Sequence, residues 1–217
     1  MIRSLIVFLL MLGSLTACQK NAPVFQEVYS NNFETNTLDK IQGGKLDIWL
    51  GNKVLGRYNN DGFSLQLSGL GEHTEVEVSF DLNIHDGWDG NVMGDATNRI
   101  GPDLWNMQID GLEQMNTTFS NRACVFGYCF QQAYPQNYPY HNDPRLGASN
   151  GNLPGFCIPQ TPAGGGTALY KIKKRIFHKK STFVLSCRDV LQDSTVPDKL
   201  CEESWSIDNL VIKLINQ

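Results

Sequence analysis

The sequence predicts an all-β protein built as a two-sheet sandwich. Several short runs alternate apolar and polar side chains, the period of a strand that lays one face on a core. No window keeps a helical period of 3.6 residues over three turns with recognisable caps. Turn-forming residues separate the runs, a pattern typical of sandwiches made from many short strands.

Residues 1–17 have the features of a bacterial export signal. Arg3 supplies a positive charge, and residues 5–15 form an apolar run too short to span a bilayer. Small residues then precede Cys18. This order resembles the lipobox of bacterial lipoproteins, which implies a Cys18 carrying acyl chains such as palmitate; the alternative is an ordinary signal peptide. Since Gln19 and not aspartate follows, the resemblance favours the outer membrane, on either face.

The remainder is expected to form one domain. Residues 18–26 are interpreted as a lipidated N-terminus and tether, and residues 27–217 as a single β-sandwich. The chain has 18 Lys and Arg against 22 Asp and Glu, a net charge of −4. This mild acidity argues against a nucleic-acid partner, which requires a basic surface. No second apolar segment of the sequence approaches membrane-spanning length, so membrane contact is expected only through the lipid on Cys18.

Six segments show the strand alternation. In residues 74–85, the clearest case, five apolar side chains point one way and polar partners the other: Val76, Val78, Phe80, Leu82 and Ile84. The other predicted strands are residues 62–67, 104–109, 168–176, 182–187 and 207–215.

The interval 121–166 is different, because it is rich in proline, glycine, asparagine and tyrosine. Loops of this length in compact domains are usually functional or mobile. Tyr134, Tyr138 and Tyr140 lie within it. Their flat rings suit stacking on a sugar face, or equally packing that holds a long loop against the sandwich.

The cysteines suggest disulfides, since export leads to an oxidising compartment. Cys187 and Cys201 flank a polar loop and are predicted to form one bridge. One of Cys124, Cys129 and Cys157 is then expected to stay unpaired. A zinc site is the competing interpretation, but Cys124 and Cys129, with four residues between them, lack the tight spacing and second ligand pair of a zinc knuckle.

Two acidic stretches far apart in the sequence are predicted to meet in space. Residues 86–90 (Asp-Gly-Trp-Asp-Gly) follow the clearest strand, and residues 202–209 (Glu-Glu-Ser-Trp-Ser-Ile-Asp-Asn) lead into the last one. Carboxylates at strand ends are the ligands that Ca²⁺ requires. Asp95 and Asp103, in the intervening loop, could add oxygens. The alternative is that these acids cap turns while the tryptophans pack at the sandwich edge.

The order of several short motifs carries a family resemblance. Residues 80–82 run into the first acidic stretch and are followed by residues 101–105, 117–121 and 132–135, and by the second acidic stretch. Over about residues 63–214 this order resembles the concanavalin A-like (laminin G-like) jelly-roll domains of secreted bacterial proteins. The chain departs from that pattern at Gly87, Glu202 and Ser206, and in the cysteine-containing insert around residues 124–129.

This resemblance implies a jelly roll of two curved antiparallel sheets, frequently with calcium and often binding glycans. The residues expected to bind Ca²⁺ are Asp86, Asp89, Asp103, Glu203 and Asp208. Those expected to contact a ligand are Trp88, Asn121, Tyr134, Tyr138 and Tyr140.

The sequence thus favours a lipid-anchored binding module over an enzyme, with a calcium-supported carbohydrate or cell-surface adhesion role. One alternative is a polysaccharide-active hydrolase or lyase on the same fold, for which Glu75 and Glu77 are the nearest carboxylate pair. Another is a structural envelope lipoprotein without a small ligand. The Gly-x-Ser-x-Gly match at residues 147–151 lacks the preceding strand and following helix of a nucleophile elbow.

Overall fold

The computed structural model describes residues 22–92, 102–124, 126–192 and 197–216. The predicted export signal, the lipidation site Cys18 and the possible ligand Asp95 lie outside these ranges. Within them, no helix is long and apolar enough to cross a bilayer.

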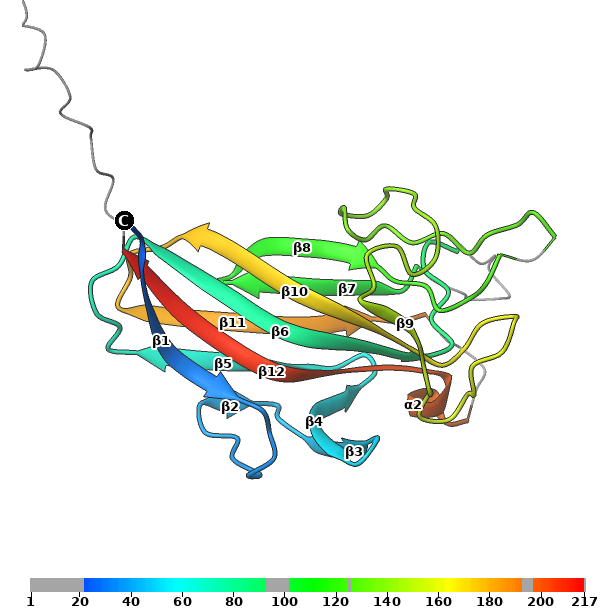
Figure 1. The fold of residues 1–217 in the computed structure, drawn as a ribbon, viewed down its shortest axis with the longest axis horizontal. Coiled ribbons are helices and arrows are strands. Elements are labelled where there is room, and N and C mark those ends of the chain that lie inside the picture. The colour runs from blue at the N-terminus through cyan, green and yellow to red at the C-terminus, as the bar shows by residue number, and fades with distance from the viewer. Residues whose placement is uncertain (1–21, 93–101, 125, 193–196, 217) are drawn as a thin grey trace, which may run out of the picture.

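The described chain forms an antiparallel jelly-roll sandwich of two sheets, as predicted (Figure 1). The first sheet has the order β3-β4-β12-β6-β10-β9, and β1 also pairs with β12. Its strands are β1 (Val24–Asn31), β3 (Leu46–Trp49), β4 (Asn52–Tyr58), β6 (Glu75–Asp86), β9 (Asn150–Leu153), β10 (Thr167–Phe177) and β12 (Glu203–Asn216). The second sheet has the order β2-β5-β11-β7-β8. Its strands are β2 (Ile41–Gln42), β5 (Gly62–Ser68), β7 (Leu104–Ile109), β8 (Leu112–Thr118) and β11 (Thr182–Val190).

A single short helix, α2 (Lys199–Glu202), precedes β12 in the described part of the chain. Asp198 caps it, because its side chain accepts a hydrogen bond from the Cys201 backbone N–H at 3.2 Å.

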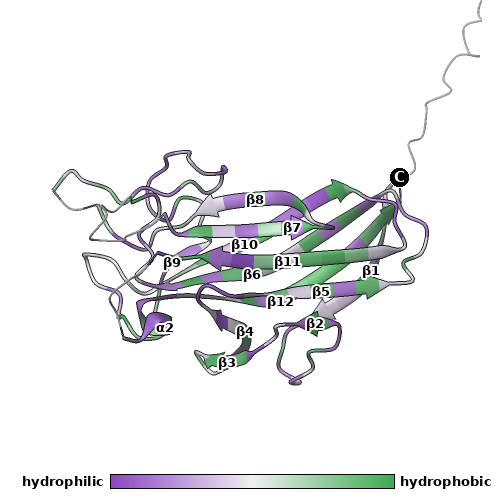
Figure 2. Ribbon diagram, turned by 180° about the vertical axis from the view of Figure 1, so that it is seen from behind, coloured by the Kyte–Doolittle hydropathy of each residue, from purple (hydrophilic) through white to green (hydrophobic). Residues whose placement is uncertain are grey.

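The core lies between the two sheets and follows the alternation of the sequence, which Figure 2 shows as changes of hydropathy along the strands. All five predicted core residues of β6 are buried, from 0% exposure at Val76 to 2% at Phe80. The opposite face of β6 is less exposed than predicted. Glu77, for example, is 5% exposed because Lys173 and Arg175 on β10 each place a cation 3.0 Å from its carboxylate.

All six predicted strands are present with small shifts of their ends, and the structure adds others. Strand β1 begins at Val24, three residues before the predicted domain boundary at 27, and pairs with β12. Strands such as β3 and β9 are four residues each, too short for an alternating pattern to stand out.

The two ends of the sandwich differ in character. Strand β1 starts beside the C-terminus at one end, while the loops of residues 121–166 and helix α2 lie at the other (Figure 1). We call these the terminal end and the loop end.

Candidate functional site

The two acidic stretches meet at the loop end, as predicted. The backbone N–H of Gly87 donates to the Glu202 carbonyl at 2.7 Å, and Asp86 is paired in register with Glu203. A Cβ on residue 87 would lie 2.7 Å from that same carbonyl oxygen, so this close approach requires glycine. Trp88 adds a third link, since its indole N–H donates to the Ser204 carbonyl at 2.9 Å.

Three of the five predicted metal ligands converge there. Asp89, Asp103 and Glu203 each place a carboxylate oxygen within 4.8 Å of the other two. Their exposed fractions are 5%, 0% and 2%. We call these three residues the acidic triad.

The strand period explains why two members of the acidic triad point into the sandwich. Glu203 shares its face of β12 with the core residues Trp205 and Ile207. Asp103 directly precedes β7 and lies two residues before Trp105, so it points to the same side as that core residue. Carboxylates from the two opposing sheets therefore meet at the loop end of the core.

Asp103 is held by the turn that carries Asp89. Its Oδ2 accepts the backbone N–H of Asp89 at 2.9 Å and that of Gly90 at 3.2 Å, while its own N–H donates to the Gly90 carbonyl. Gly90 has φ +77°, and a Cβ there would collide with the Gln131 carbonyl. Asp89 in turn forms an isolated antiparallel bridge with Ser120. The backbone therefore orients both carboxylates.

The spacing of the acidic triad is compatible with the binding of a hard cation. Three ionised carboxylates at this spacing repel one another strongly unless protons, a neighbouring positive side chain or a bound cation compensate their charge. Oxygens bound to one Ca²⁺ at about 2.4 Å can be at most about 4.8 Å apart, which this spacing satisfies.

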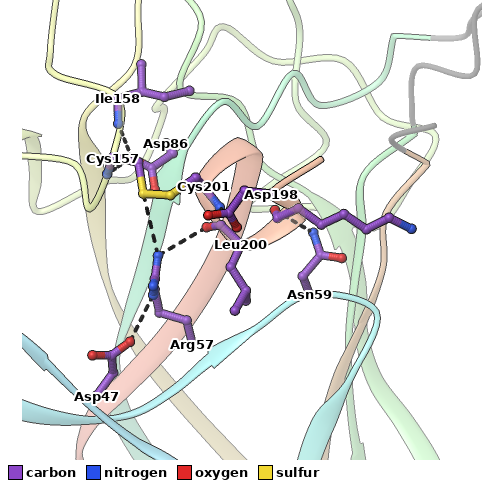
Figure 3. The surroundings of a disulfide bond; sticks show 10 residues. Asp47, Arg57, Asn59, Asp86, Cys157, Ile158, Asp198, Leu200 and Cys201 are labelled. Atoms are coloured by element: carbon purple, nitrogen blue, oxygen red, sulfur yellow. Dashed lines mark hydrogen bonds and ion pairs between the residues drawn. A yellow bond between two sulfur atoms is a disulfide. The ribbon is translucent and has the colours of Figure 1, made fainter. Parts of the chain in front are cut away.

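Asp86, although predicted as a ligand, takes the turn-capping role. Its φ of +67° breaks the alternation of β6 and turns the side chain away from the acidic triad. Its Oδ1 accepts the backbone N–H groups of Cys157 at 3.0 Å and Ile158 at 2.8 Å (Figure 3). Burial raises the pKa of Asp86, and these donors partly offset that rise.

Asp208, also predicted as a ligand, lies elsewhere on β12. It is five residues beyond Glu203, which at about 3.3 Å per residue is roughly 16 Å along the strand, and the odd spacing places it on the opposite face. Its Oδ1 accepts the Asn209 N–H at 2.7 Å. Burial, as the largest cause, raises the pKa of Asp208.

The predicted Cys187–Cys201 bridge is wrong. Cys201 is bonded to Cys157, and Cys124 is bonded to Cys129. Cys187 is a free thiol, 1% exposed, on the core face of β11, and burial raises its pKa well above the usual value. The prediction that one of Cys124, Cys129 and Cys157 stays unpaired is therefore wrong as well.

The Cys157–Cys201 disulfide joins the loop before β10 to helix α2, next to Asp86 (Figure 3). Arg57 on β4 supports this junction. Its guanidinium donates to the Leu200 carbonyl at 3.3 Å, pairs with Asp47 at 3.0 Å, and lies 4.1 Å from the Phe156 ring centre. The disulfide thus fixes the entry of β12, and with it Glu203.

Most of the predicted ligand-contacting side chains are structural. Trp88 and Asn121 are fully buried, and the Asn121 amide donates to the Ile84 carbonyl at 2.8 Å. The Tyr134 ring lies 5.0 Å from both Phe119 and Tyr170, so it holds the loop onto the core. Tyr138 is half-buried, whereas Tyr140 is 54% exposed.

Sequence reasoning missed an exposed aromatic loop that precedes these tyrosines in the chain. The Cys124–Cys129 bridge closes a short loop that presents Phe126, 105% exposed, and Tyr128, 58% exposed. The Tyr128 ring packs edge-on against Phe130, 5.2 Å between centres. We call Phe126 and Tyr128 the aromatic tip. Two cysteines enclosing aromatic residues and Gly127 were the available signal.

Comparison with known proteins assigns no family. No family model and no curated protein matches the chain. Among solved structures, it is similar to a GH115 4-O-methyl-α-glucuronidase with specificity for decorated arabinogalactans (TM-score 0.41, 14% identity, 88% of this chain and 18% of that one). It is also similar to a family 35 carbohydrate-binding module from Clostridium thermocellum (TM-score 0.33, 10% identity, 88% and 97%). A third match is latent PorU from Porphyromonas gingivalis (TM-score 0.34, 8% identity, 90% and 13%). At these scores the similarity does not define a function, and the chain spans about a fifth of the first of them.

Proposed function

We propose that this protein is an exported, lipid-anchored carbohydrate-binding module whose loop end is stabilised by calcium. The observation that carries the proposal is the acidic triad. Three carboxylates from different parts of the chain converge, almost fully buried, at the base of the loops. A bound Ca²⁺ would compensate their charge and tie β12, β7 and the turn after β6 to one point.

The loops above the acidic triad supply a surface that suits sugars. Exposed aromatic side chains, Tyr140 and the aromatic tip, lie in the loop-end segment. Their rings can stack on the apolar face of a sugar ring. Arg145 keeps this segment in place, because its guanidinium donates to the carbonyls of Asn121 at 2.7 Å and Gly165 at 2.8 Å. The two ends of the segment are therefore held together, which lowers the entropic cost of ordering it on binding.

The proposed anchor fits the arrangement of the two ends. A lipid on Cys18 would hold the terminal end at the outer membrane, because β1 starts there. The loop end would then point away from the bilayer toward glycans or a cell-surface partner. In this proposal the jelly roll belongs to the concanavalin A-like group that the sequence motifs resemble.

The ion pairs of Glu75 and Glu77, the one carboxylate pair considered for hydrolysis, favour a binding role over catalysis. Glu77 is engaged by two cations, as described above, and Glu75 has Arg175 at 3.9 Å. Both acids therefore act in a ladder of cross-strand ion pairs.

A glycan array tests the carbohydrate part. The chain of residues 22–217, which contains every described strand, is probed in calcium and again after chelation. We expect binding in calcium, weaker binding after chelation, and loss of binding in a Phe126→Ala/Tyr128→Ala variant. Phe177→Ala, which removes another exposed aromatic ring at the terminal end, is the control and should bind normally. An array without any signal in calcium would refute the carbohydrate role and leave the metal proposal to its own test.

A further inference from the structure

The terminal end carries exposed apolar side chains that the loop-end function does not use. Cross-strand pairing places Phe25, Ile215, Glu75 and Phe177 in one row across β1, β12, β6 and β10. Phe25 is 47% exposed and Phe177 is 73% exposed, on the outer face of the sheet. This row lies at the end of the sheet where β1 begins.

The neighbouring turn of the second sheet adds another exposed apolar residue. Leu112, 68% exposed, follows the β7–β8 turn. Asp110 ties this turn to the β10–β11 turn, since its carboxylate contacts Lys180 Nζ at 2.9 Å and His178 Nε2 at 3.3 Å. Its other oxygen accepts the Val184 N–H at 3.0 Å. The two turns are thus held together as one surface.

An apolar groove with a cationic rim lies between these turns. Its volume is about 320 Å³, and its apolar lining residues are Ile109, Leu112, Ile176 and Phe177. Lys179 lies 5.0 Å above the Phe177 ring, and Lys180 stands beside it. Asp110 is the one acid among the described lining residues, and it is already engaged by Lys180.

We propose that this terminal surface, formed by Leu112, Phe177, Lys179 and Lys180, docks on an anionic phospholipid bilayer. Exposed apolar side chains flanked by lysines are the composition of segments that lie in a membrane interface. The inference rests on the proposed lipidation of Cys18. Ala22 is four residue steps from Cys18, so the lipid would hold this end within about 14 Å of the bilayer. The surface therefore adds a second membrane contact beside the lipid anchor and would orient the domain on the bilayer.

Vesicle sedimentation of residues 22–217 tests this inference without the lipid, so its outcome is separate from that of lipidation and of glycan binding. Vesicles of phosphatidylcholine mixed with phosphatidylglycerol are compared with phosphatidylcholine alone. The test variant is Phe177→Ser/Lys179→Gln. The matched control, Phe126→Ser/Lys199→Gln, removes one exposed phenylalanine and one exposed lysine from the loop end.

We expect the unsubstituted chain to bind the anionic vesicles, the test variant to bind at least about tenfold more weakly, and the control to bind unchanged. Equal melting temperatures of the two variants will show that both are folded. Absence of binding to anionic vesicles, or equal loss in both variants, would overturn the proposal. Self-association lost in the test variant, without vesicle binding, would also overturn it and assign the surface to a second copy of the chain.

Discussion

Removing the Cys157–Cys201 disulfide should destabilise the protein about twice as much as removing Cys124–Cys129. The bonded cysteines are separated by 44 residues in the first case and by 5 in the second. The chain-entropy relation for cross-links gives about 4 kcal/mol at 25 °C for the long loop and about 2 kcal/mol for the short one. For a domain of this size the larger loss lowers the melting temperature by about 8–16 °C.

Urea unfolding of Cys157→Ser/Cys201→Ser and Cys124→Ser/Cys129→Ser variants, each beside the parent chain of residues 22–217, measures both losses. Cys187→Ala is the control, because it removes a thiol without opening a loop. Thiol titration adds an independent check: Cys187 should react only after unfolding, and no other thiol should appear. A long-loop variant that loses no more stability than the short-loop variant would contradict this account of how the loop end is held.

Two further predictions concern buried groups near the acidic triad. Burial lowers the pKa of His85 to about 3, whereas in the unfolded chain it is near 6.5. The contribution of the neutral ring to the free energy of unfolding is therefore fully present above about pH 6.5 and is lost as the pH falls toward 3. Between pH 6.5 and 5 the free energy of unfolding of the parent should fall by about 2 kcal/mol more than that of His85→Gln. Equal pH slopes in denaturant unfolding would contradict this. Trp88→Phe, which removes the hydrogen bond to Ser204, should cost about 1 kcal/mol and leave glycan binding unchanged. A loss of glycan binding without a loss of stability would instead return Trp88 to the ligand site.

The sequence predicted the strands best where one face packs on the core. The alternation in β6 identified its buried face correctly because each apolar residue there meets the opposing sheet. The same reasoning, applied to Phe183, Leu185 and Cys187, would have placed Cys187 in the core and excluded it from a surface bridge.

The acidic triad was only partly predictable. The meeting of the two acidic stretches followed from their positions at strand ends. Asp103 and Glu203 each lie two residues before a tryptophan, Trp105 and Trp205, so the strand period could have placed both carboxylates on the core side. The left-handed conformation of Asp86 was not visible, because it depends on backbone donors from residues 157 and 158, about seventy positions away. The roles of Trp88 and Tyr134 likewise depended on packing between distant segments.

Calorimetric titration of calcium tests the central proposal most directly. We expect one Ca²⁺ to bind per chain and to raise the melting temperature by about 5–10 °C at a hundredfold excess over the dissociation constant, and both effects to be lost in Asp103→Asn. Asp208→Asn, a matched change outside the acidic triad, should bind calcium like the parent. A parent chain that takes up no calcium, or an Asp103→Asn variant that binds as the parent does, would contradict the account.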